Sequence, residues 1–145
     1  MSGYKKILVA VDLSEQSALL VEKARHLALI NHAELSIVHV HPPLPVSYAL
    51  DIPSVNLADI DAELLEEARK QLHSLGSTSD IPASRQHCLT GQPAVEIRAL
   101  AKQGGIDLIV TGGHGKHGLE LLLGSTSTSV AHGVNCDLLI VRLPD

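Results

Sequence analysis

The sequence Lys-Lys-Ile-Leu-Val-Ala-Val-Asp at residues 5–12 carries the clearest fold signal in the chain. A short, nearly unbroken apolar run of this kind is typical of a strand buried on both faces of a parallel sheet. Ser14 follows as an expected helix N-cap, and apolar residues recur at helical spacing over 18–30. A second apolar run at 35–40 completes a βαβ unit, whose crossover is right-handed.

The rest of the chain repeats this alternation. Further strands are expected at 84–89, 107–111 and 137–142, and further helices at 57–75, 93–103 and 125–132. Gly76 is expected to end the helix that begins at residue 57, and Gly104-Gly105 the helix that Pro93 begins. Five strands alternating with four helices predict one α/β domain over residues 1–145. We expect a five-stranded parallel sheet, doubly wound and Rossmann-like, in the order 3-2-1-4-5.

The amino-acid composition and net charge disfavour several classes of function. The 145 residues are 45% hydrophobic, with two Tyr, no Phe, no Trp and a net charge of −5. A chain so poor in aromatic and basic residues is a poor candidate for nucleic-acid binding, which relies on stacking and on basic patches. No apolar run reaches membrane-spanning length, and the first strand leaves no room for a signal peptide. Two cysteines, Cys88 and Cys136, fit a reducing compartment. We expect a cytoplasmic protein without a nucleic-acid or membrane partner.

A glycine- and hydroxyl-rich segment follows the strand at 107–111. Residues 111–129 hold four glycines among the first eight residues, and Gly124 precedes five consecutive hydroxyl side chains. Glycine allows the backbone to approach an anion closely, and a helix start at Ser125 offers free N–H groups to phosphate. The segment lies past the carboxyl end of a strand, where open α/β sheets bind ligands. It therefore predicts a phosphate cradle, although it contains no P-loop motif.

The chain as a whole resembles the universal stress protein family. The resemblance is carried by Tyr-Lys-Lys-Ile-Leu-Val-Ala-Val-Asp-Leu-Ser at the start, Ile-Val-His-Val in the second strand, and Asp-Leu-Ile-Val-Thr-Gly-Gly-His-Gly at 107–115. Leu-Leu-Leu-Gly-Ser-Thr and Cys-Asp-Leu-Leu-Ile-Val near the end also match. The nucleotide-binding branch of the family carries a G-x2-G-x9-G-[ST] motif. Here eight residues, 116–123, separate the second and third glycines instead of nine.

The resemblance implies a bound adenine nucleotide, ATP or AMP, with Mg²⁺ accompanying ATP. Asp12 is expected near the ribose and adenine, with Ala10 and Val40 flanking the base and the Val40 backbone bonding to its edge. Asp12 can also cap the first helical turn, and the two roles are compatible. The ribose and phosphates are expected to contact Gly112, Gly115, Gly124, Ser125, Thr126 and Ser127.

The resemblance further implies a homodimer. In the order 3-2-1-4-5 the last strand lies at an edge with unpaired backbone groups, which natural proteins cover or pair. Two subunits are expected to pair this strand antiparallel, through Leu138, Ile140 and Arg142. An unidentified protein partner would then sense the nucleotide-loaded state.

Two other functions remain open. The first alternative is a nucleotide-free interaction module, because the glycine motif is one residue short. The second and less favoured alternative is a slow ATP hydrolase, because the sequence shows no recognisable catalytic base or metal-binding carboxylate set. No catalytic residue is predicted. The nine histidines include His39 and His41 on one strand face and His114 and His117 in the glycine-rich segment, but they show no zinc-ligand spacing. No metal site is predicted.

Overall fold

The computed structural model describes residues 3–43, 56–113 and 135–144. A 3-10 turn at Ala83–Arg85 accompanies the regular elements. In chain order these are β1 (Lys6–Ala10), α1 (Ser17–Asn31), β2 (Glu34–His41), α3 (Leu57–Thr78), β3 (Gln86–Thr90), α4 (Pro93–Gly104), β4 (Leu108–Gly113) and β5 (Asp137–Arg142).

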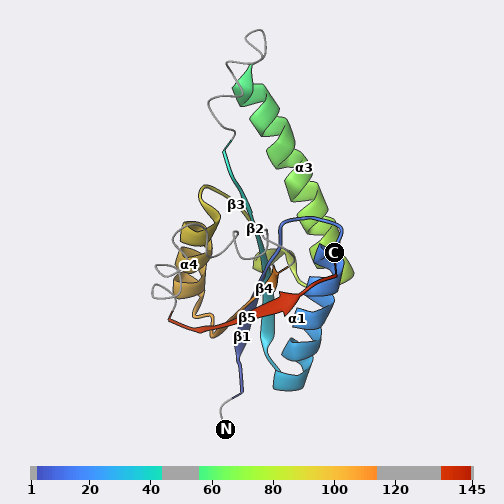
Figure 1. The fold of residues 1–145 in the computed structure, drawn as a ribbon, viewed down its shortest axis with the longest axis vertical. Helices are drawn as coiled ribbons and strands as arrows, with labels where there is room; N and C mark the ends of the chain where they lie inside the picture. Colours follow the sequence, from blue (N-terminus) through green and yellow to red (C-terminus); the bar gives the residue numbers. More distant parts are fainter. Residues whose placement is uncertain (1–2, 44–55, 114–134, 145) are drawn as a thin grey trace.

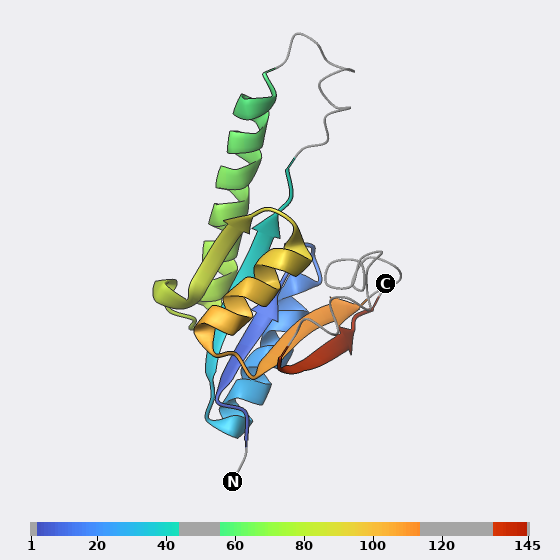
Figure 2. The ribbon, with the colours of Figure 1, turned by 90° about the vertical axis from the view of Figure 1, so that its left-hand side faces the viewer.

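The five strands form one parallel sheet in the order β3-β2-β1-β4-β5. Helices α1 and α3 cover one face and α4 covers the other (Figures 1 and 2). The predicted five-stranded, doubly wound α/β sheet and its strand order are therefore confirmed. β5 lies at one edge of the sheet, as predicted, and β3 lies at the other.

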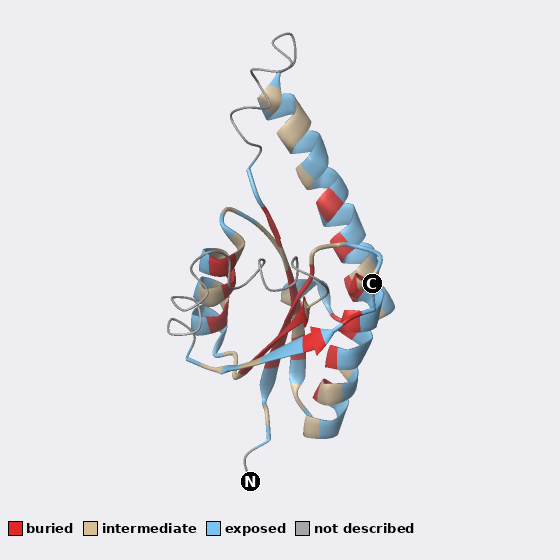
Figure 3. Cartoon of the chain, viewed as in Figure 1, coloured by how far each residue is buried: buried red, intermediate tan, exposed pale blue. Residues whose placement is uncertain are grey.

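Strand β1 shows how the sequence builds two core layers. Ile7 and Val9 belong to the cluster beneath α1 and α3, whereas Leu8 and Ala10 belong to the cluster beneath α4. Ile7, Leu8 and Val9 are completely buried, and each contributes about 1.5–3 kcal/mol through removal of apolar surface from water. Burial on both faces explains why the strand is a continuous apolar run (Figure 3).

Helix α3 continues past the glycine that was expected to end it. The prediction for Gly76 is wrong, because the helix runs to Thr78 with Ser79 as its C-cap. A Cβ atom on Gly76 would lie 2.7 Å from Cδ of Gln86, the first residue of β3. The glycine therefore makes room for a neighbouring side chain rather than for a left-handed turn. Helix α4 behaves as predicted, ending at Gly104 with Gly105 as a left-handed C-cap at φ 64°.

The start of α1 and the end of β4 also differ from prediction. α1 begins at Ser17 with Gln16 as N-cap, so the assignment of Ser14 as N-cap is wrong. β4 continues beyond Thr111 through Gly112 and Gly113, since both pair with β5. The helix expected at 125–132 and most of the proline-containing loop at 42–56 lie outside the described residues. None of the described helices combines the length and apolar character that crossing a membrane requires.

Candidate functional site

The candidate site lies at the carboxyl ends of β1, β2 and β4. β1 pairs with β2 on one side and with β4 on the other, so Ala10 has Val38 and Thr111 as its registered neighbours. The strand order reverses here, since the chain continues from β1 to β2 on one side and returns as β4 on the other. In open α/β sheets this reversal point leaves the crevice in which ligands bind.

Asp12 holds the turn that leads from β1 into α1. Its Oδ1 accepts a hydrogen bond from the Ser14 backbone N–H at 2.9 Å and another from Ser17 Oγ at 3.3 Å. Leu13 between them has a left-handed φ of 63°. The carboxylate thus ties two points of this turn together, which is why the helix starts at Ser17 rather than just after Ser14. These two bonds join Asp12 to the turn and to the Ser17 hydroxyl, and the N-cap of α1 is Gln16, without a side-chain cap bond.

Ala10 and Val40 form an apolar shelf beside Asp12. Both belong to the cluster on the α4 face of the sheet, from the adjacent strands β1 and β2, and are 6% and 4% exposed. The structure therefore brings Ala10, Asp12 and Val40 to the same end of neighbouring strands. Their contacts with a base or ribose remain a prediction. The other expected phosphate-binding residues, Gly115, Gly124, Ser125, Thr126 and Ser127, lie outside the described residues, as do His114 and His117.

Gly112 has a packing role that the sequence did not reveal. A Cβ atom at this position would lie 2.6 Å from Leu143 Cδ1 and 3.5 Å from Leu20 Cδ2. Leu143 follows β5 and is itself buried, and its backbone N–H donates to Gly113 O at 3.1 Å. The missing side chain thus lets the C-terminal segment close over β4. This packing accounts for a glycine here without any ligand, while contact between Gly112 and a nucleotide stays a prediction.

Thr111 is a candidate residue that the sequence reasoning missed. Its side chain is 2% exposed, and Oγ1 has no hydrogen-bond partner among the described residues. Leaving a hydroxyl buried in this state costs about 1–3 kcal/mol. The only signal in the sequence is a polar residue that ends the otherwise apolar run 108–110, and burial has to be known before that signal acquires meaning.

Both histidines of β2 have partners within the protein. His39 Nδ1 lies 2.9 Å from Val11 O, and His41 Nε2 lies 2.8 Å from Asp61 Oδ1 on α3. Burial lowers the pKa of His39; the bond to Val11 O opposes that shift, His41 adds to it and the Asp12 carboxylate opposes it. Within residues 3–43, 56–113 and 135–144, no three His, Cys, Asp or Glu side chains converge as metal ligands would.

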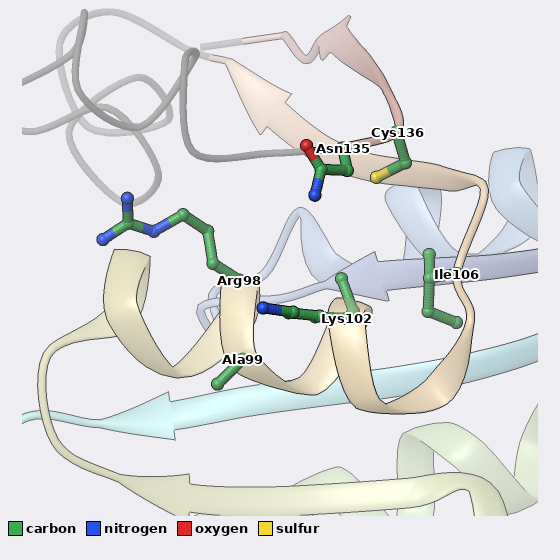
Figure 4. Close-up of a pocket in the computed structure, with 7 residues that line it drawn as sticks. Arg98, Ala99, Lys102, Ile106, Asn135 and Cys136 are labelled. Carbon is green, nitrogen blue, oxygen red and sulfur yellow. The ribbon is translucent and has the colours of Figure 1, made fainter.

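A separate cavity lies at the opposite end of the sheet. It measures about 170 Å³ between α4 and the start of β5, with Arg98 and Lys102 on the helix and Asn135 and Cys136 before the strand (Figure 4). Asp137, which follows Cys136, pairs with Leu108 at the start of β4. The cavity therefore adjoins the amino ends of the strands, away from Asp12 and Thr111. Burial raises the pKa of the Cys136 thiol.

The edge strand β5 carries exposed apolar side chains. Leu139 and Ile140 are 38% and 39% exposed. Leu138 is half-buried against the α4-side cluster, and Arg142 is exposed. The edge position predicted for this strand is thus accompanied by apolar surface. Pairing with a second subunit remains a prediction.

Comparison with known proteins gives matches along the whole chain. The profile of the universal stress protein family matches residues 3–142. Universal stress protein A homolog 2 of Coxiella burnetii is 42% identical over 144 residues, which cover 99% of this chain and 98% of that protein. A solved structure of a universal stress protein in complex with cAMP superposes with a TM-score of 0.61 at 25% identity, covering 97% and 98% of the two chains. The structure of protein MJ0577 superposes with a TM-score of 0.73 at 23% identity and 99% coverage of both, a likeness of fold alone.

Proposed function

This chain belongs to the universal stress protein family, and from that membership we propose that it binds an adenine nucleotide, ATP or AMP, as a regulatory ligand in the stress response. The observation that carries the proposal is the meeting of Ala10, Asp12 and Val40 at the carboxyl ends of adjacent parallel strands. A carboxylate beside an apolar shelf suits a nucleoside, because ribose hydroxyls donate to a carboxylate and a base packs on apolar side chains. The relative solved with cAMP, itself an adenine nucleotide, supports this ligand class.

In the proposed complex, Asp12 accepts hydrogen bonds from the ribose. The base lies on Ala10 and Val40, and the Val40 backbone bonds to its edge. The phosphates contact Gly112, Gly115, Gly124, Ser125, Thr126 and Ser127, with Mg²⁺ accompanying ATP. The location that fits this role is the cytoplasm.

We further propose that two copies pair through β5. An edge strand with unpaired backbone groups and exposed Leu139 and Ile140 is stabilised when a second strand covers it. Antiparallel pairing through Leu138, Ile140 and Arg142 would join two sheets into one and place the two nucleotide sites on one particle. Sedimentation or light scattering tests the dimer, and Ile140→Lys is expected to favour the monomer.

The test of nucleotide binding is isothermal titration of the nucleotide-stripped protein with ATP, AMP and cAMP. We expect micromolar binding of at least one of them. Asp12→Asn keeps an acceptor for Ser14 and Ser17 but removes the charge, and we expect about a tenfold or larger loss of affinity, the worth of a hydrogen bond to a charged group. Asp59→Asn, at an exposed carboxylate in the first turn of α3, is the matched control.

Two outcomes favour the alternatives. A folded wild type that binds none of the three nucleotides at millimolar concentration would contradict the proposal and support a nucleotide-free interaction module. Steady ATP turnover faster than about one per minute would support the hydrolase, although even that rate lies well below the typical enzyme value of about 10 per second.

A further inference from the structure

The Thr111 hydroxyl is exceptional among the buried polar side chains of the described residues. Ser17, His41 and Thr111 make up that buried polar set. Ser17 Oγ donates to Asp12, and His41 Nε2 is bonded to Asp61. Only Thr111 keeps a buried oxygen without a hydrogen-bond partner in the part of the chain that the structure describes. Such groups are few in native proteins, and each calls for an explanation, such as strain, a bound water or ion, or a functional role.

The position of Thr111 favours a ligand. Side chains alternate along a strand, so Thr111 shares the α4 face with Ile109, which belongs to the cluster that also contains Ala10 and Val40. In register, Thr111 lies between Ala10 of β1 and Ile140 of β5. The orphaned hydroxyl thus lies on the same face and at the same strand ends as the apolar shelf.

One of the two registered neighbours of Thr111 is a small residue. Ala10 beside it has only a methyl group. Gly113, two residues further along β4, has no side chain, and a Cβ there would lie 2.7 Å from Ile140 Cγ2. The Ile140 side chain therefore occupies the space that a side chain at Gly113 would fill, and the residue that leaves room for a flat apolar group beside Thr111 is Ala10.

We propose that the Thr111 hydroxyl hydrogen-bonds to the edge of the nucleobase, a role that rests on the nucleotide binding proposed above. A hydroxyl can donate to a ring nitrogen or accept from an exocyclic amine, so it suits the mixed donor and acceptor edge of adenine. Bound nucleotide then satisfies an oxygen that has no hydrogen-bond partner among the described residues. Thr111 selects for a base, whereas Asp12 serves the ribose.

A purely structural role predicts a different residue. Valine has almost the shape of threonine, packs well in strands and lacks the orphaned oxygen. Replacing an unsatisfied buried group with an apolar isostere stabilises a protein. The fold by itself therefore favours valine at 111, as it has Leu, Ile and Val at 108–110, and the hydroxyl works against the stability of the empty protein.

The test uses two variants and two properties. We expect Thr111→Val to raise the urea midpoint of the nucleotide-free protein and to weaken AMP and ATP binding by about threefold to tenfold, the worth of one hydrogen bond. Thr111→Ser keeps the hydroxyl, and we expect it to bind within about twofold of the wild type. Thr90→Val, at an exposed threonine that ends β3, is the control for the same substitution elsewhere and leaves binding unchanged.

Ribose 5-phosphate distinguishes the base from the sugar. The difference between wild type and Thr111→Val is expected to vanish with this probe, because it lacks the base. A difference that persists would overturn the assignment to the base. Equal AMP and ATP affinity of wild type and Thr111→Val, or a lower urea midpoint for the empty variant, would overturn the inference as a whole. Failure of the wild type to bind any nucleotide would instead refute the proposed function on which it rests.

Discussion

The contact between Gly112 and Leu143 allows a stability change to be predicted from a distance. In Gly112→Ala the new methyl carbon would lie 2.6 Å from Leu143 Cδ1, about 1 Å closer than the usual separation of about 3.5–4.0 Å between carbons in contact. Leu143 must leave its rotamer or shift its backbone, and overpacking of this kind costs about 1–3 kcal/mol. The lower flexibility of alanine in the unfolded chain returns about 0.5–1 kcal/mol. We expect a net loss of about 1–2 kcal/mol in the free energy of unfolding.

A double-mutant cycle assigns this loss to Leu143. Leu143→Ala alone removes a buried side chain and is expected to cost about 2–5 kcal/mol. In that background Gly112→Ala meets no Cδ1 atom and partly fills the new cavity, so its cost is expected to fall to about zero. The coupling energy is then about 1–2 kcal/mol, within the range seen for residues in contact.

Urea unfolding followed by circular dichroism measures all four proteins. Nucleotide must be absent, and the protein concentration constant, because a ligand or a subunit that binds only the folded state would shift the midpoints. Coupling below about 0.3 kcal/mol, the scatter for independent sites, would refute the role of Leu143. Gly112 would then be needed for something other than packing.

Three further predictions concern the described part of the fold. Because burial lowers the pKa of His39 in the folded state, the unfolded chain takes up its proton first, at about pH 6.5. The contribution of His39 is therefore complete above that pH and is lost as the pH falls from about 6.5 toward the folded pKa. His39→Asn retains a donor for Val11 O, and its urea midpoint should fall less between pH 7 and pH 5 than that of the wild type; an identical fall would contradict the prediction. Gly105→Ala places a side chain at φ 64° and should cost about 1 kcal/mol in urea unfolding, whereas an unchanged midpoint would show that the C-cap relaxes. Asp107 accepts the Lys5 and Lys6 backbone N–H groups at 2.8 and 3.1 Å, and Asp107→Ala should destabilise by about 1–3 kcal/mol and speed amide exchange at both residues; unchanged exchange would argue against these bonds.

The strands could be predicted because they depend on short-range patterns, and their order then followed from the doubly wound fold class. Continuous apolar runs marked the strands buried on both faces, and β5 was predicted with the bounds that the structure has. Gly105 signalled the end of α4 because its left-handed φ is a local property. Gly76 gave the same sequence signal, but the reason for a glycine there is different: the side chain of Gln86 from β3 lies against it. A glycine that accommodates a distant side chain cannot be distinguished from a helix stop until the tertiary contacts are known.

Some residues of the candidate site could be predicted from the sequence, and others could not. Asp12 was predictable from its place after β1, and Ala10 and Val40 came from the family resemblance. The shift of the helix start to Ser17 was not predictable, because it depends on which atoms the Asp12 carboxylate reaches. Thr111 was missed for a similar reason. A threonine in a strand is unremarkable by sequence, and the missing partner of its hydroxyl becomes evident only when the neighbouring strands are in place.

The residues predicted to hold the nucleotide that lie in the described part of the chain also stabilise the protein itself. Asp12 ties the turn after β1, Gly112 admits Leu143, and Ala10 belongs to the buried cluster under α4. A substitution at any of them lowers stability and binding together, so a loss of affinity alone does not establish contact with the ligand. The Thr111 hydroxyl is different, because its removal should stabilise the empty fold while weakening the complex. Opposite signs in the two measurements cannot arise from damage to the fold, and this makes Thr111 the most informative position in the described part of the site.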